Sequence, residues 1–262
     1  MEIRKIKLYT YQWKASHPVG ASVLIIHGLG EHAGRYRSIV NTLNEYGIDV
    51  YSFDLPGHGK SPGKRGHIAS FEKLFEYIGR YLESISGKKV ILGHSLGGLI
   101  ALRVAEEYPD TIEGIVASSP AIHIKKVNPL LQFIAMLLDK VIPSLTMSNQ
   151  LNPKDISRSQ EEVNAYINDP LVHDRISARL YGEMVRNVKY LWEKASHTKL
   201  PLLLQVGEND NIVPPHPAVE FARIWGGNAR LIQYPGAYHE LYEDPYIGKQ
   251  AISDVLEFIR GL

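Results

Sequence analysis

Short apolar runs recur along the chain, and helix-like stretches separate them. Strand-like runs are predicted at residues 21–26, 49–53, 89–92, 112–117, 201–206 and 229–234, after an alternating segment over residues 3–14. Helical stretches are predicted at about residues 34–46, 68–86 and 96–108. Several of the strand runs are continuously apolar, which is typical of a parallel sheet covered on both faces. We therefore expect an α/β fold with a mostly parallel central sheet flanked by helices, and functional loops after the carboxyl ends of the strands.

The alternation of strands and helices stops between about Ser119 and Ser177. This stretch carries no signal for a buried strand and offers helices interrupted by Pro143, Pro153 and Pro170. We expect a helical cap, or lid, at residues 119–177. It would be inserted after the sixth strand of a core made of residues 1–118 and 178–262.

One helix of this cap is unusually apolar. Asn128 is predicted as its N-cap and Pro129 as its first residue, followed by the apolar stretch Leu130 to Leu138. Three interpretations stay open for this stretch: the core of the cap, the wall of an acyl pocket, or contact with lipid. The surrounding apolar tract, residues 130–142, is too short to span a bilayer.

Composition excludes several classes of function. The 262 residues are enough for one large domain, and 29 Lys plus Arg nearly balance 28 Asp plus Glu, so nothing indicates nucleic acid. The absence of cysteine excludes disulfides, cysteine-ligated zinc and a thiol nucleophile. Since no H-E-x-x-H motif occurs either, we expect no metal and no cofactor.

The first residues bear on location. Residues 1–7 alternate charged and apolar side chains and lack the continuous apolar stretch of a signal peptide. We expect a cytoplasmic protein, with transient contact of the cap with a membrane or micelle surface as an open alternative. The oligomeric state is left open.

A nucleophile is predicted at Ser95. The G-x-S-x-G pattern of residues 93–97 lies between a strand-like and a helix-like run, as a nucleophile elbow requires. A second G-x-S-x-G, at residues 59–63, places Pro62 after Ser61. Because proline has no N–H to offer an oxyanion, Ser61 is interpreted as a loop residue.

A serine nucleophile needs a base and a carboxylate that orients the base. Asp210 follows the strand at 201–206 and His239 follows the strand at 229–234. The order Ser95, Asp210, His239 is the one found in α/β-hydrolases. Glu208 and His216 remain competitors by spacing, although only His239 ends its own strand before the last helix.

The turn after the strand at 21–26 is a candidate for the oxyanion hole. Its glycines let the main chain approach a substrate, and the N–H of Leu29 would join the N–H of Leu96. The same turn supports a rival, a dinucleotide-binding oxidoreductase, because Gly28, Gly30 and Ala33 match G-x-G-x-x-A and Asp54 follows at a suitable distance. Against this rival, the Glu31 carboxylate stands where a pyrophosphate would meet the helix. A non-catalytic ligand receptor on the same fold is a further alternative.

These motifs together resemble the monoacylglycerol lipase and lysophospholipase group of α/β-hydrolases over nearly the whole chain. The resemblance rests on residues 27–32 with 34–36, 54–61, 93–97, 151–153 and 169–172. It implies an esterase that removes one acyl chain from glycerol through an acyl-enzyme. Ser95 would be the nucleophile, His239 the acid and base, Asp210 its orienting group, and the Leu29 and Leu96 amides the oxyanion hole.

The resemblance leaves the substrate class open. It thins over residues 121–148, so a lysophospholipase or a short-chain carboxylesterase remains an alternative. A small-molecule acyl ester is the expected substrate in each case.

Overall fold

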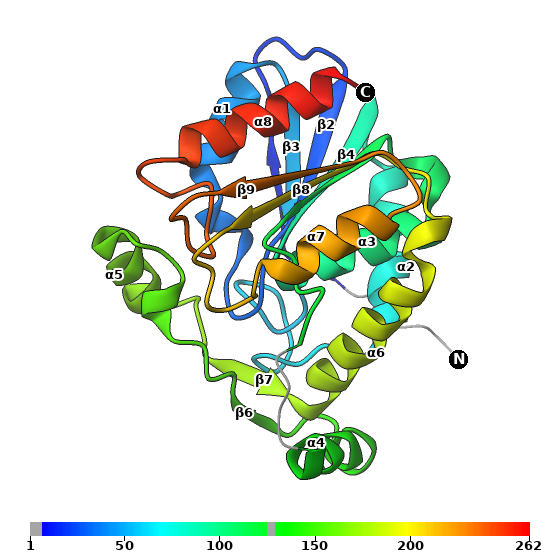
Figure 1. Cartoon of the computed structure of the whole chain (residues 1–262), viewed down its shortest axis with the longest axis vertical. Helices are drawn as coiled ribbons and strands as arrows, with labels where there is room; N and C mark the ends of the chain where they lie inside the picture. Colours follow the sequence, from blue (N-terminus) through cyan, green and yellow to red (C-terminus); the bar gives the residue numbers. More distant parts are fainter. Residues whose placement is uncertain (1–6, 125–128) are drawn as a thin grey trace.

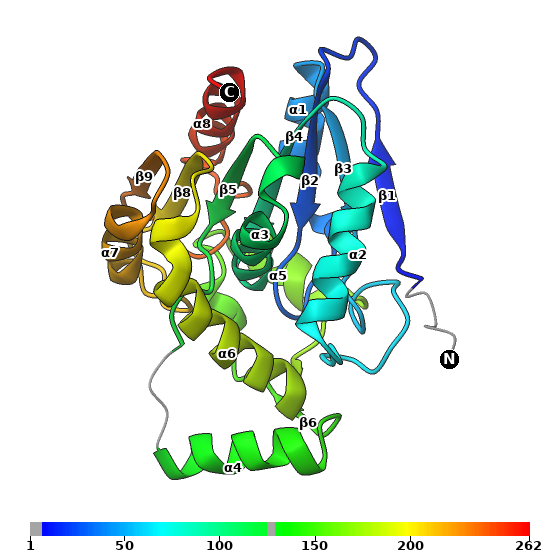
Figure 2. The same cartoon turned by 90° about the vertical axis from the view of Figure 1, so that its right-hand side faces the viewer.

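Seven strands form the central sheet in the order β1-β3-β2-β4-β5-β8-β9 (Figures 1 and 2). The structure, a computed structural model, describes residues 7–124 and 129–262. The strands are β1 (Thr10–Trp13), β2 (Ala21–Ile26), β3 (Asp49–Phe53), β4 (Lys88–His94), β5 (Gly114–Ser118), β8 (Leu202–Gly207) and β9 (Ala229–Tyr234). Only β1 pairs antiparallel in this sheet; the other neighbours are parallel. The predicted, mostly parallel sheet is confirmed.

Helices cover both faces of the sheet because successive strand residues point to opposite sides. Val23 and Ile25 pack with α1 (Arg37–Glu45) and α8 (Gly248–Arg260), whereas Leu24 and Ile26 pack on the other face. That other face is covered by α2 (Phe71–Glu83), α3 (Leu96–Glu107), α6 (Ala178–Lys194) and α7 (His216–Ile224) (Figure 2). Short 3₁₀ turns lie at Ala33–Arg35, Pro109–Thr111, Pro153–Asp155 and Ala195–His197. Buried apolar side chains on both faces thus explain the continuously apolar strands.

The predicted and observed elements differ mainly in the residues at which they begin and end. The strand predicted over residues 3–14 is confirmed at Thr10–Trp13, while residues 7–9 are not in a strand and residues 3–6 lie outside the described part. The helix predicted from residue 68 begins at Phe71 instead, because the Ser70 hydroxyl accepts the Lys73 N–H at 3.2 Å and caps the helix there.

Residues 119–177 contain elements that lie outside the central sheet. They are α4 (Pro129–Val141), β6 (Thr146–Ser148), α5 (Gln160–Asn168) and β7 (Arg175–Ser177). Figure 1 shows α4, β6 and β7 at the lower end of the molecule and α5 at its left-hand side. Pro129 is the first helical residue as predicted, and Asn128 lies outside the described residues. β6 and β7 pair as an antiparallel ribbon that the sequence did not predict, since three-residue strands give no periodic signal. The segment follows the fifth strand of the described chain, which the prediction had counted as the sixth.

Helix α4 turns an apolar face away from the protein. Its buried Asp139 pairs with Arg179 and, at 2.7 Å, with Arg186, both on α6. The outward face carries Leu130, Phe133, Leu137 and Val141, all exposed. The outward face of α4 therefore does not pack in a core, and a small buried cluster within residues 119–177 is formed by Ile156, Val163 and Tyr166. Within the two described ranges, no helix combines the length and apolarity needed to cross a membrane.

Candidate active site

Ser95 lies in a sharp turn between β4 and α3. Its backbone has φ 53° and ψ −116°, a left-handed conformation that a side-chain-bearing residue seldom adopts. The flanking glycines allow it: a Cβ on Gly93 would lie 2.2 Å from the Gly97 oxygen, and one on Gly97 would lie 2.0 Å from the Ile26 oxygen. The structure thus contains the strand–turn–helix that the motif predicted, with Ser95 at its apex.

Ser61, in the second motif, is held in a structural role. Its hydroxyl donates to the Asp54 carbonyl at 2.5 Å and accepts the Tyr9 N–H at 2.9 Å. The side chain is buried in a loop.

Asp210 and His239 form a direct pair at the carboxyl ends of β8 and β9. His239 Nδ1 lies 2.6 Å from Asp210 Oδ2, and both side chains are buried. The other carboxylate oxygen accepts the N–H groups of Ile212 and Val213 at 2.8 and 2.9 Å. Because a carboxylate accepts the Nδ1 proton, the Nε2 of the neutral ring is left as the acceptor that a general base needs.

The competing residues are placed elsewhere. Glu208 and His216 are both exposed, and His216 begins α7. The structure therefore brings Asp210, and not Glu208, to His239.

The electrostatics of the pair favour a charged carboxylate and a basic imidazole. Burial alone would lower the pKa of His239, but the Asp210 carboxylate outweighs burial and raises it above its usual value. Burial alone would raise the pKa of Asp210, and the imidazole with the two backbone N–H groups outweighs burial and lowers it. Asp210 is thus set to stay ionised while His239 accepts a proton.

Three contacts bring Ser95 and His239 to the same edge of the sheet. The ring of His94, the residue before Ser95, lies 4.6 Å from the ring of His239, centroid to centroid. Ser119 donates its hydroxyl to the His239 carbonyl at 2.9 Å, and Ala121 N–H donates to the Ser95 carbonyl at 2.9 Å. Burial, with the charge of His239, lowers the pKa of His94 to about 4, so His94 stays neutral beside the pair. No sequence pattern marked Ser119, which buries its hydroxyl at the end of β5.

The turn after β2 lies beside Ser95. A Cβ on Gly28 would lie 3.2 Å from the Ser95 Cβ and 3.3 Å from the His94 ring. Leu29 follows directly, and Leu96 carries the first N–H of α3, which a helix leaves without an intrahelical partner. The two candidate oxyanion donors are therefore carried by segments that meet at Ser95.

The chain itself fills the positions that a dinucleotide site would use. Glu31 accepts the Gly28 N–H at 2.6 Å and the Tyr36 hydroxyl at 2.7 Å. Asp54 accepts the N–H groups of Ala33 and Lys60 at 2.9 and 2.8 Å. Among the residues that the structure describes, no group of three or more His, Asp or Glu could hold a metal ion.

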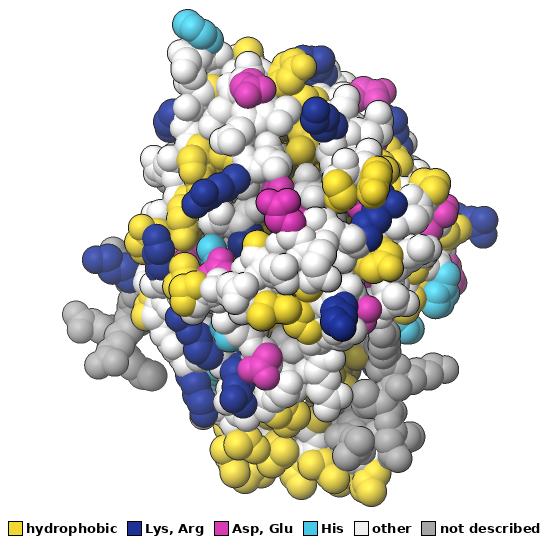
Figure 3. Space-filling model, turned by 90° about the vertical axis from the view of Figure 1, so that its left-hand side faces the viewer, with side chains coloured by type: hydrophobic (Ala, Val, Ile, Leu, Met, Phe, Trp, Pro, Cys, Tyr) yellow, Lys and Arg dark blue, Asp and Glu magenta, His cyan; other side chains and the backbone are white. Residues whose placement is uncertain are grey.

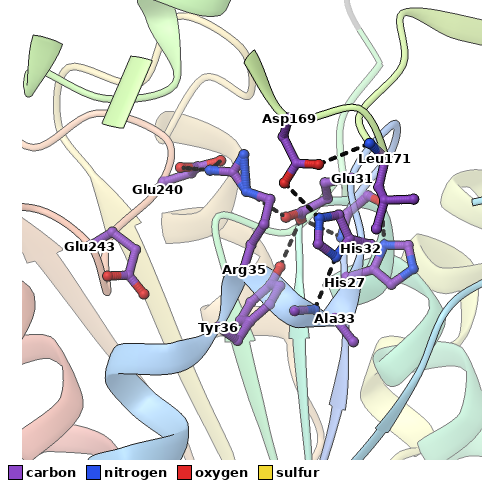
Figure 4. Close-up of polar contacts among 12 residues, drawn as sticks. His27, Glu31, His32, Ala33, Arg35, Tyr36, Asp169, Leu171, Glu240 and Glu243 are labelled. Carbon is purple, nitrogen blue, oxygen red and sulfur yellow. Dashed lines mark hydrogen bonds and ion pairs between the residues drawn. The ribbon is translucent and has the colours of Figure 1, made fainter. Parts of the chain in front are cut away.

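A buried ion-pair network joins this turn to the loop of His239. Arg35 donates to both oxygens of Glu240 at 3.0 and 2.8 Å and lies 3.6 Å from Glu31 (Figure 4). Burial raises the pKa of Glu240 to about 7. A cavity of about 20 Å³ beside the network, also lined by Tyr36 and His94, has room for one water. Sequence reasoning missed Arg35 and Glu240, which are 205 residues apart.

The sheet topology and a buried Asp–His pair beside a serine elbow define an α/β-hydrolase. The model of one family of these enzymes, described as serine aminopeptidase S33 (Hydrolase_4), matches residues 17–246, and the chain belongs to that family.

Within the family the chain is similar to monoacylglycerol lipases. The crystal structure of the Paleococcus ferrophilus monoacylglycerol lipase has a TM-score of 0.91 at 41% identity and covers 97% of this chain and 98% of that one. The Mycolicibacterium smegmatis monoacylglycerol lipase is 32% identical over 90% of this chain and 87% of its own length. The phospholipase YtpA of Bacillus subtilis is 30% identical over 90% of this chain and 93% of its own length. These findings confirm the predicted fold and the predicted family resemblance.

Proposed function

We propose that the protein is a serine ester hydrolase that releases the fatty acid of a monoacylglycerol. The observation that carries this proposal is the buried Asp210–His239 pair beside the Ser95 elbow, in a chain similar to monoacylglycerol lipases over nearly its whole length. The pair supplies a base, and the elbow supplies an alcohol in a strained turn.

In the mechanism, Ser95 Oγ attacks the ester carbonyl while His239 Nε2 takes its proton. The N–H groups of Leu29 and Leu96 stabilise the tetrahedral oxyanion. His239 then gives the proton to the departing glycerol oxygen. The glycerol is released, and the acyl group remains bound to Ser95 as the acyl-enzyme. Water repeats the cycle, giving a proton to His239 and its oxygen to the acyl carbon, and the fatty acid is released with Ser95 restored.

We further propose that residues 119–177 form a cap over the site and that α4 contacts a lipid surface. On the outward face of α4, apolar side chains recur every three or four residues, at Leu130, Phe133, Leu137 and Val141. This spacing places them on one stripe of the helix. Figure 3 shows hydrophobic side chains gathered at the lower end of the molecule, where Figure 1 places α4. A water-insoluble substrate would be presented at such a surface. The cytoplasmic location expected from residues 1–7 stays a prediction.

A lysophospholipase is the second candidate, favoured by the similarity to phospholipase YtpA over most of both chains. The two candidates share the acyl chemistry and differ in the group attached to glycerol.

A substrate panel separates the candidates. It compares by kcat/KM a monoacylglycerol and a lysophosphatidylcholine of the same acyl length, together with a soluble acetyl ester and an aminoacyl arylamide. The proposal predicts the highest kcat/KM for the monoacylglycerol. Its advantage over the acetyl ester follows from the long chain, because each buried CH₂ adds about 0.8 kcal/mol. A preference for the lysophospholipid would establish the second candidate, and a preference for the acetyl ester or the arylamide would refute both.

A further inference from the structure

The turn that carries Leu29 is held by residues 169–173, which belong to the proposed cap. His173 donates its N–H to the Gly30 carbonyl at 2.8 Å, and Asp169 Oδ2 lies 2.8 Å from His32 Nε2 (Figure 4). The approach is so close that a Cβ on Gly30, where φ is +81°, would lie 2.3 Å from the His173 carbonyl oxygen. Residues 169–173 therefore pack directly against the turn that carries Leu29.

Both oxygens of Asp169 are used. Oδ1 accepts the Leu171 N–H at 2.8 Å, which closes the turn of its own segment. His32 Nδ1 accepts the Gly34 N–H at 3.1 Å, so the His32 proton lies on Nε2 and is donated to Asp169 Oδ2. An asparagine at position 169 could accept only one of these two N–H groups and would present its own N–H to the other.

Leu29 lies between two sets of hydrogen bonds that hold the turn. On one side, the Gly28 N–H is held by Glu31 at 2.6 Å within the turn. On the other side, Gly30 and His32 are held by His173 and Asp169 from the cap segment. The direction of the Leu29 N–H follows from the backbone angles at residues 28–30, and these two sets of hydrogen bonds restrain those angles.

We propose that Asp169, acting through His32, is a positioning residue for the oxyanion turn, so that stabilisation of the transition state depends on the seating of residues 169–173. The inference rests on the proposed function, because it assigns Leu29 N–H to the oxyanion. Asp169 does not touch the substrate in this account.

The test is Asp169→Asn, with Asp174→Asn as its matched control. Asp174 directly follows this segment and is exposed, and its side chain pairs with Arg175 at 3.2 Å. The control therefore makes the same charge change at a side chain that does not pair with the turn. Asp169→Asn is expected to lower kcat about tenfold to hundredfold with KM little changed, because a misdirected donor loses part of the oxyanion stabilisation. Asp174→Asn should keep the kcat of the unsubstituted protein.

Two further measurements separate positioning from a general loss of structure. A trifluoromethyl ketone, which forms an anionic tetrahedral adduct, should bind Asp169→Asn more weakly by about the factor lost in kcat. A non-hydrolysable ether analogue of the substrate should bind unchanged. The midpoint of the pH–rate profile should also stay in place, because the carboxylates that raise the pKa of His239 are Asp210, Glu240 and Glu31.

Substitutions at His32 test the same contact from the other side. His32→Gln places an amide N–H where Nε2 lies and should retain most of kcat. His32→Asn keeps only the acceptor for the Gly34 N–H, and its kcat should fall as that of Asp169→Asn does. This variant tests the inference even if Asp169→Asn fails to fold. Equal kcat in all four variants, or equal losses in Asp169→Asn and Asp174→Asn, would overturn the inference. Failure of the proposed function would show instead as an unsubstituted protein without esterase activity.

Discussion

Asp210→Asn is expected to disable catalysis while leaving the fold intact, and the structure gives the reason. The N–H groups of Ile212 and Val213 both donate to one oxygen of residue 210, at 2.8 and 2.9 Å. They hold the amide oxygen of an asparagine on their side and turn its NH₂ toward His239 Nδ1. The imidazole must then place its proton on Nε2, and Nε2 can no longer accept the proton of Ser95.

The magnitude follows from the loss of the base. A triad with its histidine in the wrong tautomer loses about 10⁴ in kcat, which corresponds to roughly 5.4 kcal/mol of transition-state stabilisation. The midpoint of the remaining pH–rate profile should fall as well, since Asp210 is the first of the carboxylates that raise the pKa of His239 against its burial. Release of a chromogenic acid or alcohol from a soluble ester, followed from pH 5 to 9, measures both effects.

Glu208→Gln is the control for this substitution. It removes one negative charge from the same loop, two residues away, at an exposed side chain. It should leave kcat and the pH midpoint unchanged. If Asp210→Asn kept kcat within tenfold of the unsubstituted protein, or if Glu208→Gln lost as much, the assignment of the orienting carboxylate would be refuted.

Further predictions concern pH, the lipid-facing helix and the elbow. Activity should fall with acid through a midpoint above 6.5, because His239 must be neutral to accept a proton and its pKa is raised; a profile flat down to pH 5 would argue against a histidine base. Phe133→Ser with Leu137→Ser, at side chains 65% and 50% exposed, should weaken vesicle binding by about 2 kcal/mol, roughly thirtyfold. Flotation with lipid vesicles measures that change, and equal binding of both proteins would contradict it. Gly97→Ala should lower the free energy of unfolding by about 1–3 kcal/mol, since its Cβ would lie 2.0 Å from the Ile26 oxygen; an unchanged Tm would count against the packing of the elbow.

The parts of the fold that depend on local pattern could be predicted from the sequence. The strands Ala21–Ile26, Asp49–Phe53 and Ala229–Tyr234 begin and end where their apolar runs do. The sequence predicts Ser95, Asp210 and His239 together because the carboxyl ends of parallel strands meet at one edge, and the structure brings Asp210 and His239 into contact there. Residues that follow separate strands are therefore within reach of sequence reasoning when the topology is simple.

Contacts set by packing between distant loops could not be predicted. Arg35 and Glu240 meet because two turns converge beside His239, and Asp169 meets His32 because residues 169–173 fold back onto the turn after β2. A periodic pattern carries no information on such approaches, since each joins loops that lie far apart in the sequence. The orientation of α4 is a related case: the density of apolar residues leaves three interpretations open, and it carries no sign of the ion pairs that join the buried Asp139 to α6.

Covalent labelling at Ser95 tests the central claim most directly. The protein is treated with a fluorophosphonate, and its intact mass and the modified peptide are determined by mass spectrometry. The account predicts one adduct per chain, located on Ser95, absent from Ser95→Ala and formed far more slowly in Asp210→Asn. An adduct on another residue, or equal labelling of Ser95→Ala, would contradict it.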